Sequence, residues 1–131
     1  MTTATTTQLQ TQLHARLLEL HRMLLALVRA DYEKEHGAVP NAGAMLQLVI
    51  NHEAFAWLRP LSTLLVELDD KDLVPDGAAA RAAVEKLLRS GNAFSARYAQ
   101  VLESTPEIAA EHGEVMRIVK NLPEPLPRVS A

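Results

Sequence analysis

The chain has 131 residues, of which 48% are hydrophobic and 22% are charged, and its formal net charge is −3. This balance indicates a folded domain and excludes a disordered chain. Nucleic-acid binding draws much of its affinity from Lys and Arg on phosphate, so the missing basic excess argues against it.

Residue usage narrows the class of protein further. The apolar residues are mainly Leu, Ala and Val, and only five residues are aromatic, which favours helix over strand. There is no run of about 18 apolar residues, so we expect no membrane span. The absence of cysteine excludes disulfides and thiolate metal ligands, and it is typical of a cytoplasmic protein.

A first long helix is predicted from Gln8 to His36. Leucines repeat along it at alternating spacings of four and three, the pattern of a helix packed in a bundle, at Leu13, Leu17, Leu20, Leu24 and Leu27. Gly37 can end the helix in a left-handed conformation. The Thr-rich residues 1–7 precede this pattern, and we predict a frayed N-terminus there.

A second helix is predicted to start at Asn41, whose side chain can cap it, and to run to about Asp72. Pro60 falls inside this span, but the apolar pattern continues on both sides of the proline. We therefore predict one helix with a kink at Pro60 instead of two helices.

A third helix follows the turn at residues 75–77 and extends past Gly91. Gly91 lies on its apolar stripe, where it would either let a neighbouring helix approach closely or break the helix. A fourth, shorter helix starts at Thr105–Glu107 and ends near Leu122. The alternating prolines of residues 123–131 predict an extended tail.

These elements predict one all-α domain over residues 1–131. Short connections between four helices favour an antiparallel up-down-up-down four-helix bundle, with the second helix kinked and the fourth helix short. The short fourth helix would leave one end of the bundle open to the tail, to a partner subunit or to a ligand. Apolar surface left uncovered in this way favours self-association, and we predict a homodimer.

Several polar residues interrupt the apolar stripes of the predicted helices. Buried charges are costly unless they are paired, so such residues either pair with one another or bind a ligand. An inward network of this kind could hold a small anionic or polar molecule. The ligand-binding candidates are Asp31, Tyr32, His52, Arg59, Arg97 and His112.

Metal binding is the other chemistry that the histidines suggest. His52 and His112 would meet if their helices touched, whereas His21 would lie too far along the bundle to join them. Only one Glu-x-x-His pair is present, Glu33 with His36, and a di-iron bundle needs two. We therefore expect no metal and no other cofactor, and we expect each histidine to hydrogen-bond to a neighbour.

Part of the chain resembles a known group of proteins. The segment Phe55–Ser62 (FAWLRPLS), together with residues 66–69, 29–33 and 36–37, resembles a bacterial family of small all-helical proteins, over roughly residues 13–70. This resemblance implies a bacterial protein and carries no activity. At the level of the fold the chain is also similar to hemerythrin-like and DinB-like bundles, although it lacks the His and Glu spacings of the former.

Two functions remain open at this point. Neither a Gly-x-Ser-x-Gly context nor a glycine-rich phosphate loop is present, which favours a protein that is not an enzyme. The first hypothesis is a non-enzymatic helical bundle with an interaction or structural role, acting as a homodimer. The alternative is a small-molecule- or metal-binding bundle of hemerythrin-like or DinB-like architecture that uses the inward His, Asp and Arg residues.

Overall fold

The structure, a computed structural model, describes residues 5–124. Within this range the chain forms helices and no strand, which confirms the all-α prediction. None of these helices combines the length and the apolarity needed to cross a lipid bilayer. The seven helices are α1 (Thr6–His36), α2 (Ala42–Asn51), α3 (Glu53–Ala56), α4 (Arg59–Leu68), α5 (Gly77–Arg89), α6 (Ala93–Ser104) and α7 (Pro106–Asn121).

The N-terminus of α1 is capped. The Thr5 hydroxyl accepts a hydrogen bond from the backbone N–H of Gln8 at 3.1 Å, and the Gln8 side chain accepts one from the backbone of Thr5 at 2.8 Å. This reciprocal capping box satisfies two backbone donors. The predicted fraying was therefore wrong for residues 5–7, and residues 1–4 lie outside the described range. Gly37 ends the helix at a positive φ of 84°.

The predicted second helix is three separate helices, α2, α3 and α4. His52 has an extended backbone, with ψ of 133°, between α2 and α3, and its Nδ1 accepts a hydrogen bond from the N–H of Ala54 at 3.1 Å. Trp57 and Leu58 separate α3 from α4. Pro60 lies in the first turn of α4, where its missing N–H leaves no hydrogen bond unmade. The predicted kink was wrong because the proline helps to start a helix here.

The predicted third helix breaks at residues 90–92 into α5 and α6. Gly91 has φ of 73°, and an added Cβ there would meet nothing within 4 Å, so this glycine serves a turn and no close helix contact. Asn92 caps α6 by accepting a hydrogen bond from the N–H of Ser95 at 2.8 Å. Its side-chain amide donates to the carbonyl of Leu87 at 3.2 Å, near the end of α5. The break is therefore the correct interpretation of Gly91.

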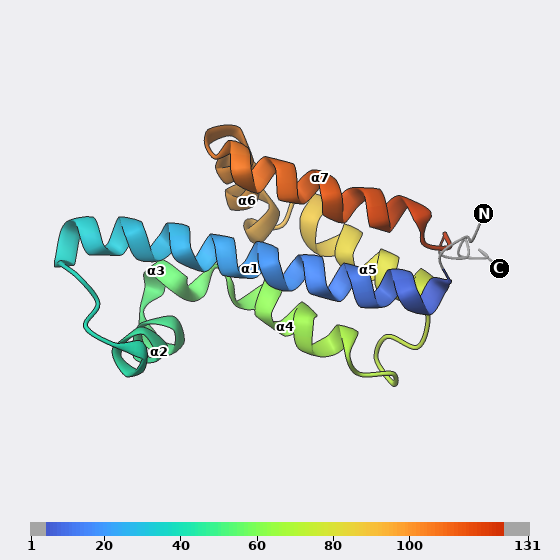
Figure 1. The fold of residues 1–131 in the computed structure, drawn as a ribbon, viewed down its shortest axis with the longest axis horizontal. Helices are drawn as coiled ribbons and strands as arrows, with labels where there is room; N and C mark the ends of the chain where they lie inside the picture. Colours follow the sequence, from blue (N-terminus) through green and yellow to red (C-terminus); the bar gives the residue numbers. More distant parts are fainter. Residues whose placement is uncertain (1–4, 125–131) are drawn as a thin grey trace.

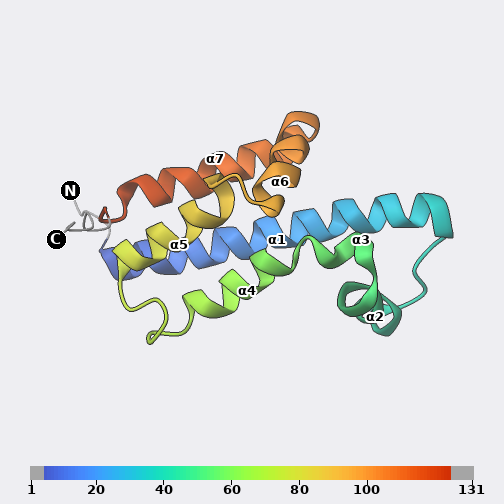
Figure 2. The same cartoon turned by 180° about the vertical axis from the view of Figure 1, so that it is seen from behind.

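α1 is the helix against which most of the others pack. It contacts α3, α4, α5 and α7, and Figures 1 and 2 show α4, α5 and α7 along the half of α1 nearest its N-terminus. The predicted leucine stripe is the centre of the core, with at most 1% exposure at Leu13, Leu17, Leu20 and Leu24. No residue of α1 after Val28 is buried.

The arrangement differs from the predicted bundle of three long helices and one short one. α7 has 16 residues, fewer than the 31 of α1 but more than any of α2 to α6, so the last helix is short only beside α1. α6 turns away from the direction of α1, and α2 and α3 lie beside the end of α1 that α7 does not reach (Figure 1). Of the predicted extended tail, Pro123 and Glu124 are non-helical, and residues 125–131 lie outside the described range.

Two glycines lead to opposite predictions for stability. Replacing Gly91 with alanine places a Cβ at a positive φ, and we expect the free energy of unfolding to fall by about 1 kcal/mol. Gly113 lies inside α7, where an added Cβ meets nothing within 4 Å. Gly113→Ala should therefore raise the free energy of unfolding by about 0.5–1 kcal/mol. Urea unfolding measures both changes, and an unchanged or increased stability of Gly91→Ala would contradict the turn at Gly91.

Candidate functional site

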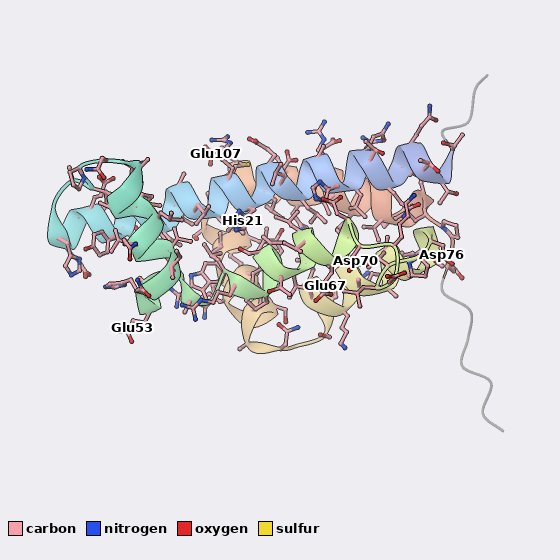
Figure 3. All side chains as sticks on the ribbon, turned by 90° about the horizontal axis from the view of Figure 1, so that it is seen from below. His21, Glu53, Glu67, Asp70, Asp76 and Glu107 are labelled. Atoms are coloured by element: carbon pink, nitrogen blue, oxygen red, sulfur yellow. The ribbon has the colours of Figure 1, made fainter. Side chains whose placement is uncertain are left out.

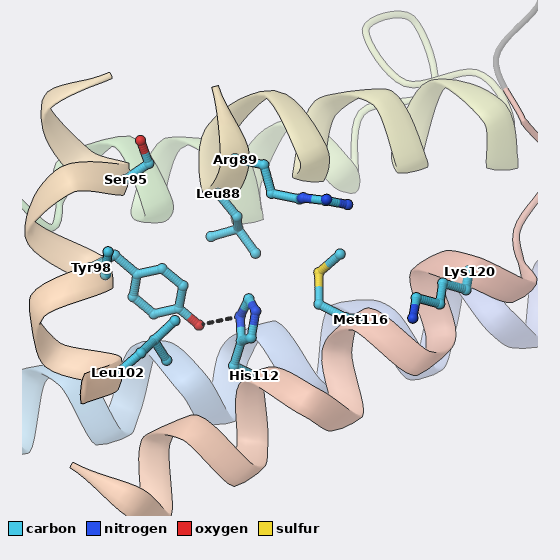
Figure 4. Close-up of a pocket in the computed structure, with 9 residues that line it drawn as sticks. Leu88, Arg89, Ser95, Tyr98, Leu102, His112, Met116 and Lys120 are labelled. Atoms are coloured by element: carbon cyan, nitrogen blue, oxygen red, sulfur yellow. Dashed lines mark hydrogen bonds between the residues drawn. The ribbon is translucent and has the colours of Figure 1, made fainter. Parts of the chain in front are cut away.

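Three consecutive helices, α5, α6 and α7, line an open hollow. Its volume is about 310 Å³, and Figure 4 shows side chains from each of the three helices around it. The apolar part of its lining includes Leu88 and Met116. Its polar part includes Arg89, Tyr98 and Lys120 together with His112, which the sequence predicted as a ligand-binding residue.

Tyr98 and His112 form the central hydrogen bond of this hollow, with 2.8 Å between the tyrosine hydroxyl and Nδ1 of the imidazole (Figure 4). Burial raises the pKa of Tyr98, and the nearby Glu111 carboxylate adds to this effect. Burial also lowers the pKa of His112, helped by the positive charge of Arg89. Tyr98 therefore keeps its proton and donates a hydrogen bond to Nδ1 of a neutral His112, whose second nitrogen, Nε2, must carry the imidazole proton.

The polar groups that line this hollow are hydrogen-bond donors or are already paired. Arg89 and Lys120 bring positive charge to it, and His112 brings the N–H at Nε2. The hydroxyl of Ser95 already donates to a backbone carbonyl at 3.0 Å. None of the lining residues is acidic, although Glu85 lies 3.9 Å from Arg89. The hollow therefore matches a small molecule with a negative charge and an apolar portion.

A second hollow, of about 190 Å³, lies between α1, α3 and α6. Four of the six predicted ligand-binding residues line it, namely Asp31, Tyr32, His52 and Arg97. The Tyr32 ring stacks on the ring of His36, with 4.4 Å between centroids, and meets the ring of His52 edge-on at 5.2 Å. The structure thus brings together the greater part of the predicted cluster.

Two details of this second hollow differ from the prediction. Asp31 does not point into the core, because its side chain is 68% exposed and lies 3.8 Å from Lys34. The guanidinium of Arg97 lies over the Trp57 ring, 5.3 Å from its centroid, in a cation–π contact. Trp57 and Arg97 are forty positions apart, so no local pattern could have paired them.

The remaining two predicted residues lie elsewhere. Arg59 is exposed and donates a hydrogen bond from Nη2 to the carbonyl of Ile50 at 2.6 Å, near the C-terminus of α2. His112 belongs to the hollow between α5, α6 and α7, so it does not share a hollow with His52. The predicted single network was therefore wrong: the breaks in the helices divide it into separate sites.

The histidines also bear on metal binding. In residues 5–124, no group of three or more His, Cys, Asp or Glu side chains is arranged to hold a metal ion. His21 is a residue of α1 and is labelled in Figure 3. Its Nε2 lies 2.7 Å from the hydroxyl of Ser62 on α4. This pair matches the expectation that histidines hydrogen-bond to neighbours.

Sequence reasoning missed one feature, the exposed face of α2. This helix contains Leu46 and Ile50, which are 57% and 51% exposed, and none of its ten residues is buried. Eight of those residues are apolar or glycine, and none is charged. The signal was present in the composition of residues 42–51, but a helix assumed to continue to Asp72 concealed it.

Comparisons with protein-family models, with curated proteins and with solved structures found no match for the chain. The resemblance of the segment Phe55–Ser62 to a bacterial family of small helical proteins therefore stays a prediction. The geometry of the two hollows and of α2 carries the argument about function.

The pH dependence of stability follows from two half-buried histidines. Burial lowers the pKa of His21 and of His112 from the ordinary value of 6.5, so the unfolded chain binds protons more readily than the folded protein as the pH falls. Stability should therefore be complete above about pH 6.5 and decrease below it. Thermal unfolding between neutral and mildly acidic pH measures this.

His112→Gln is the matched variant for this prediction. Glutamine does not titrate, and its carbonyl oxygen can still accept a hydrogen bond from the Tyr98 hydroxyl. The melting temperature of this variant should fall less on acidification than that of the natural protein. An equally steep fall in both would show that His112 does not contribute.

Proposed function

We propose that this protein is a non-enzymatic helical interaction protein that acts as a homodimer. The observation that supports this most directly is α2, an uncharged apolar helix without a single buried residue. Exposing such a helix to water is unfavourable, and contiguous apolar surface of this kind marks interaction sites. α1, α4, α5 and α7 contact one another and form the packed part of the molecule that carries this helix.

The polar pairs of the protein support a role without catalysis. Serine and histidine can act as a nucleophile and its base, and here the Ser62 hydroxyl lies 2.7 Å from Nε2 of His21. Neither residue lines the two hollows described above, and burial lowers the pKa of His21. Tyr98 with His112 is the second nucleophile–base candidate. In this pair the Tyr98 hydroxyl keeps its proton because burial raises the tyrosine pKa. These pairs therefore suit structural roles better than chemistry.

The homodimer is tested by measuring mass in solution. Multi-angle light scattering across micromolar concentrations should show a species approaching twice the 14.4 kDa of one chain as concentration rises. A mass that stays at one chain over the whole range would contradict the proposed function.

Small-molecule binding is a second candidate, favoured by the donor lining of the hollow between α5, α6 and α7. Arg89 and Lys120 offer charge, Nε2 of His112 offers an N–H, and Leu88 and Met116 offer apolar contact. A small carboxylate with a short aliphatic chain has the matching chemistry, because its oxygens accept hydrogen bonds and its chain fills the apolar part.

Hexanoate and hexanol test this candidate as a matched pair of probes. Hexanoate should raise the melting temperature and hexanol should not, because only the carboxylate can use the charges. Lys120→Gln should weaken the effect, whereas Lys34→Gln, which changes a lysine that does not line this hollow, should leave it intact. Equal effects of the two probes, or no effect of hexanoate, would contradict an anion site.

A further inference from the structure

α2 is apolar on two opposite faces. Its inner face is partly buried against the core through Met45, Leu48 and Val49. Its outer face presents Leu46 and Ile50, which lie well over 90° around the helix from the centre of the inner face at about 100° per residue. A helix that is apolar all round is normally buried on all sides. The outer face of α2 therefore lacks a cover within residues 5–124.

The outer face can pair with a copy of itself because it carries no charge. No Asp, Glu, Lys, Arg or His occurs in residues 42–51. In a two-fold interface the same patch meets itself, so a charged patch would repel its copy and a neutral one does not. The polar residues toward this side are Gln47 and Asn51, whose amides both donate and accept and already bond to each other at 3.0 Å.

The shape of the outer face also suits self-pairing. Leu46, Gln47 and Ile50 lie three, four and seven positions after Gly43, so the four residues share one side of the helix, with the smallest residue at one end and a large one at the other. A Cβ at Gly43 would meet only the Asn41 side chain, at 3.4 Å, so the space outside this glycine is open. An antiparallel copy would place its Ile50 over that space.

The described ends of the chain lie away from α2. Thr6 and Pro123 both lie next to Gly77, at the end of α1 opposite to α2 (Figures 1 and 2). α1 has 31 residues and is about 46 Å long at about 1.5 Å per residue. The described residues therefore leave the outer face of α2 uncovered and available to another molecule.

We propose that the homodimer forms by antiparallel packing of α2 against α2 of a second copy, about a two-fold axis that passes between Leu46 and Gln47. This inference rests on the homodimer proposed above and adds its interface. Ile50 of each copy packs over Gly43 of the other, and Leu46 lies at the centre. A ten-residue helix is about 15 Å long, so the contact is smaller than the usual interface of about 800 Å² per partner and its affinity is modest.

Leu46→Asp tests the position of the interface. It places a charge beside its own copy, and we expect the dissociation constant of the dimer to rise by about tenfold or more. Leu18→Asp is the control, because Leu18 is 52% exposed against 57% for Leu46 and lies on α1. Circular dichroism and urea unfolding confirm that both variants fold.

The outcomes separate this inference from the proposed function. A natural protein that stays monomeric at all concentrations overturns both the homodimer and its interface. A natural dimer that persists unchanged in Leu46→Asp overturns the α2 interface and leaves the homodimer in place. A natural dimer weakened by Leu46→Asp and not by Leu18→Asp supports both.

Cysteine cross-linking tests the antiparallel direction. The chain has no cysteine of its own, so only the introduced thiols can form disulfides. Antiparallel packing places residue 43 of one copy opposite residue 50 of the other. An oxidised mixture of Gly43→Cys and Ile50→Cys should therefore give a mixed disulfide dimer, and each variant alone should give little. Efficient cross-linking of each variant alone, without the mixed product, would show parallel packing and overturn the proposed geometry.

Discussion

The burial of one leucine stripe on α1 is the interaction on which the rest of the structure depends. α4, α5 and α7 all contact α1, and the stripe from Leu13 to Leu24 is almost completely excluded from water. Each such side chain contributes about 1.5–3 kcal/mol of transfer free energy, so this seam dominates the placement of the helices. No residue of α1 after Val28 is buried, and the protein therefore has a densely packed end and an open end.

The candidate functional features follow from this asymmetry. At the open end, the break at His52 lets α2 leave the path of α4 and expose its outer face. Near the middle, the turn at Gly91 redirects α6 across the molecule (Figure 1). Arg97 and Tyr98 are neighbours on that helix and point about 100° apart. Arg97 consequently enters the hollow beside α1 and α3, and Tyr98 enters the one beside α7.

Hydrogen bonding accounts for the histidines, which had been the main candidates for chemistry. Each of the five lies within hydrogen-bond distance of a partner, and the pairs are His14 with the Leu65 carbonyl, His21 with Ser62, His36 with the Tyr32 carbonyl, His52 with the Ala54 N–H, and His112 with Tyr98. Polar groups inside a helical protein lose less free energy when paired in this way. The exposed apolar side chains of α2 have no partners of this kind within the described residues, and the proposed function therefore rests on this helix.

The sequence by itself determined that the chain is helical and which face of α1 is buried. Leucine spacing, the ending at Gly37 and the start at Pro106 are local signals, since each depends on residues within one or two turns. Only the tertiary structure decided where the long predicted helices break. At His52, a local hydrogen bond and the packing of Phe55 and Leu58 outweigh helix continuation, and histidine is no standard breaker.

The same limit applies to the candidate site. Periodicity placed Asp31, Tyr32, His52 and Arg97 near one another, and the structure gathers them in one hollow. It also placed Arg59 and His112 with them, and there it failed, because each break resets the direction in which the following helix points its side chains. The direction of a side chain follows from local spacing only while a helix continues. Where helices break, the sum of long-range contacts decides which residues meet.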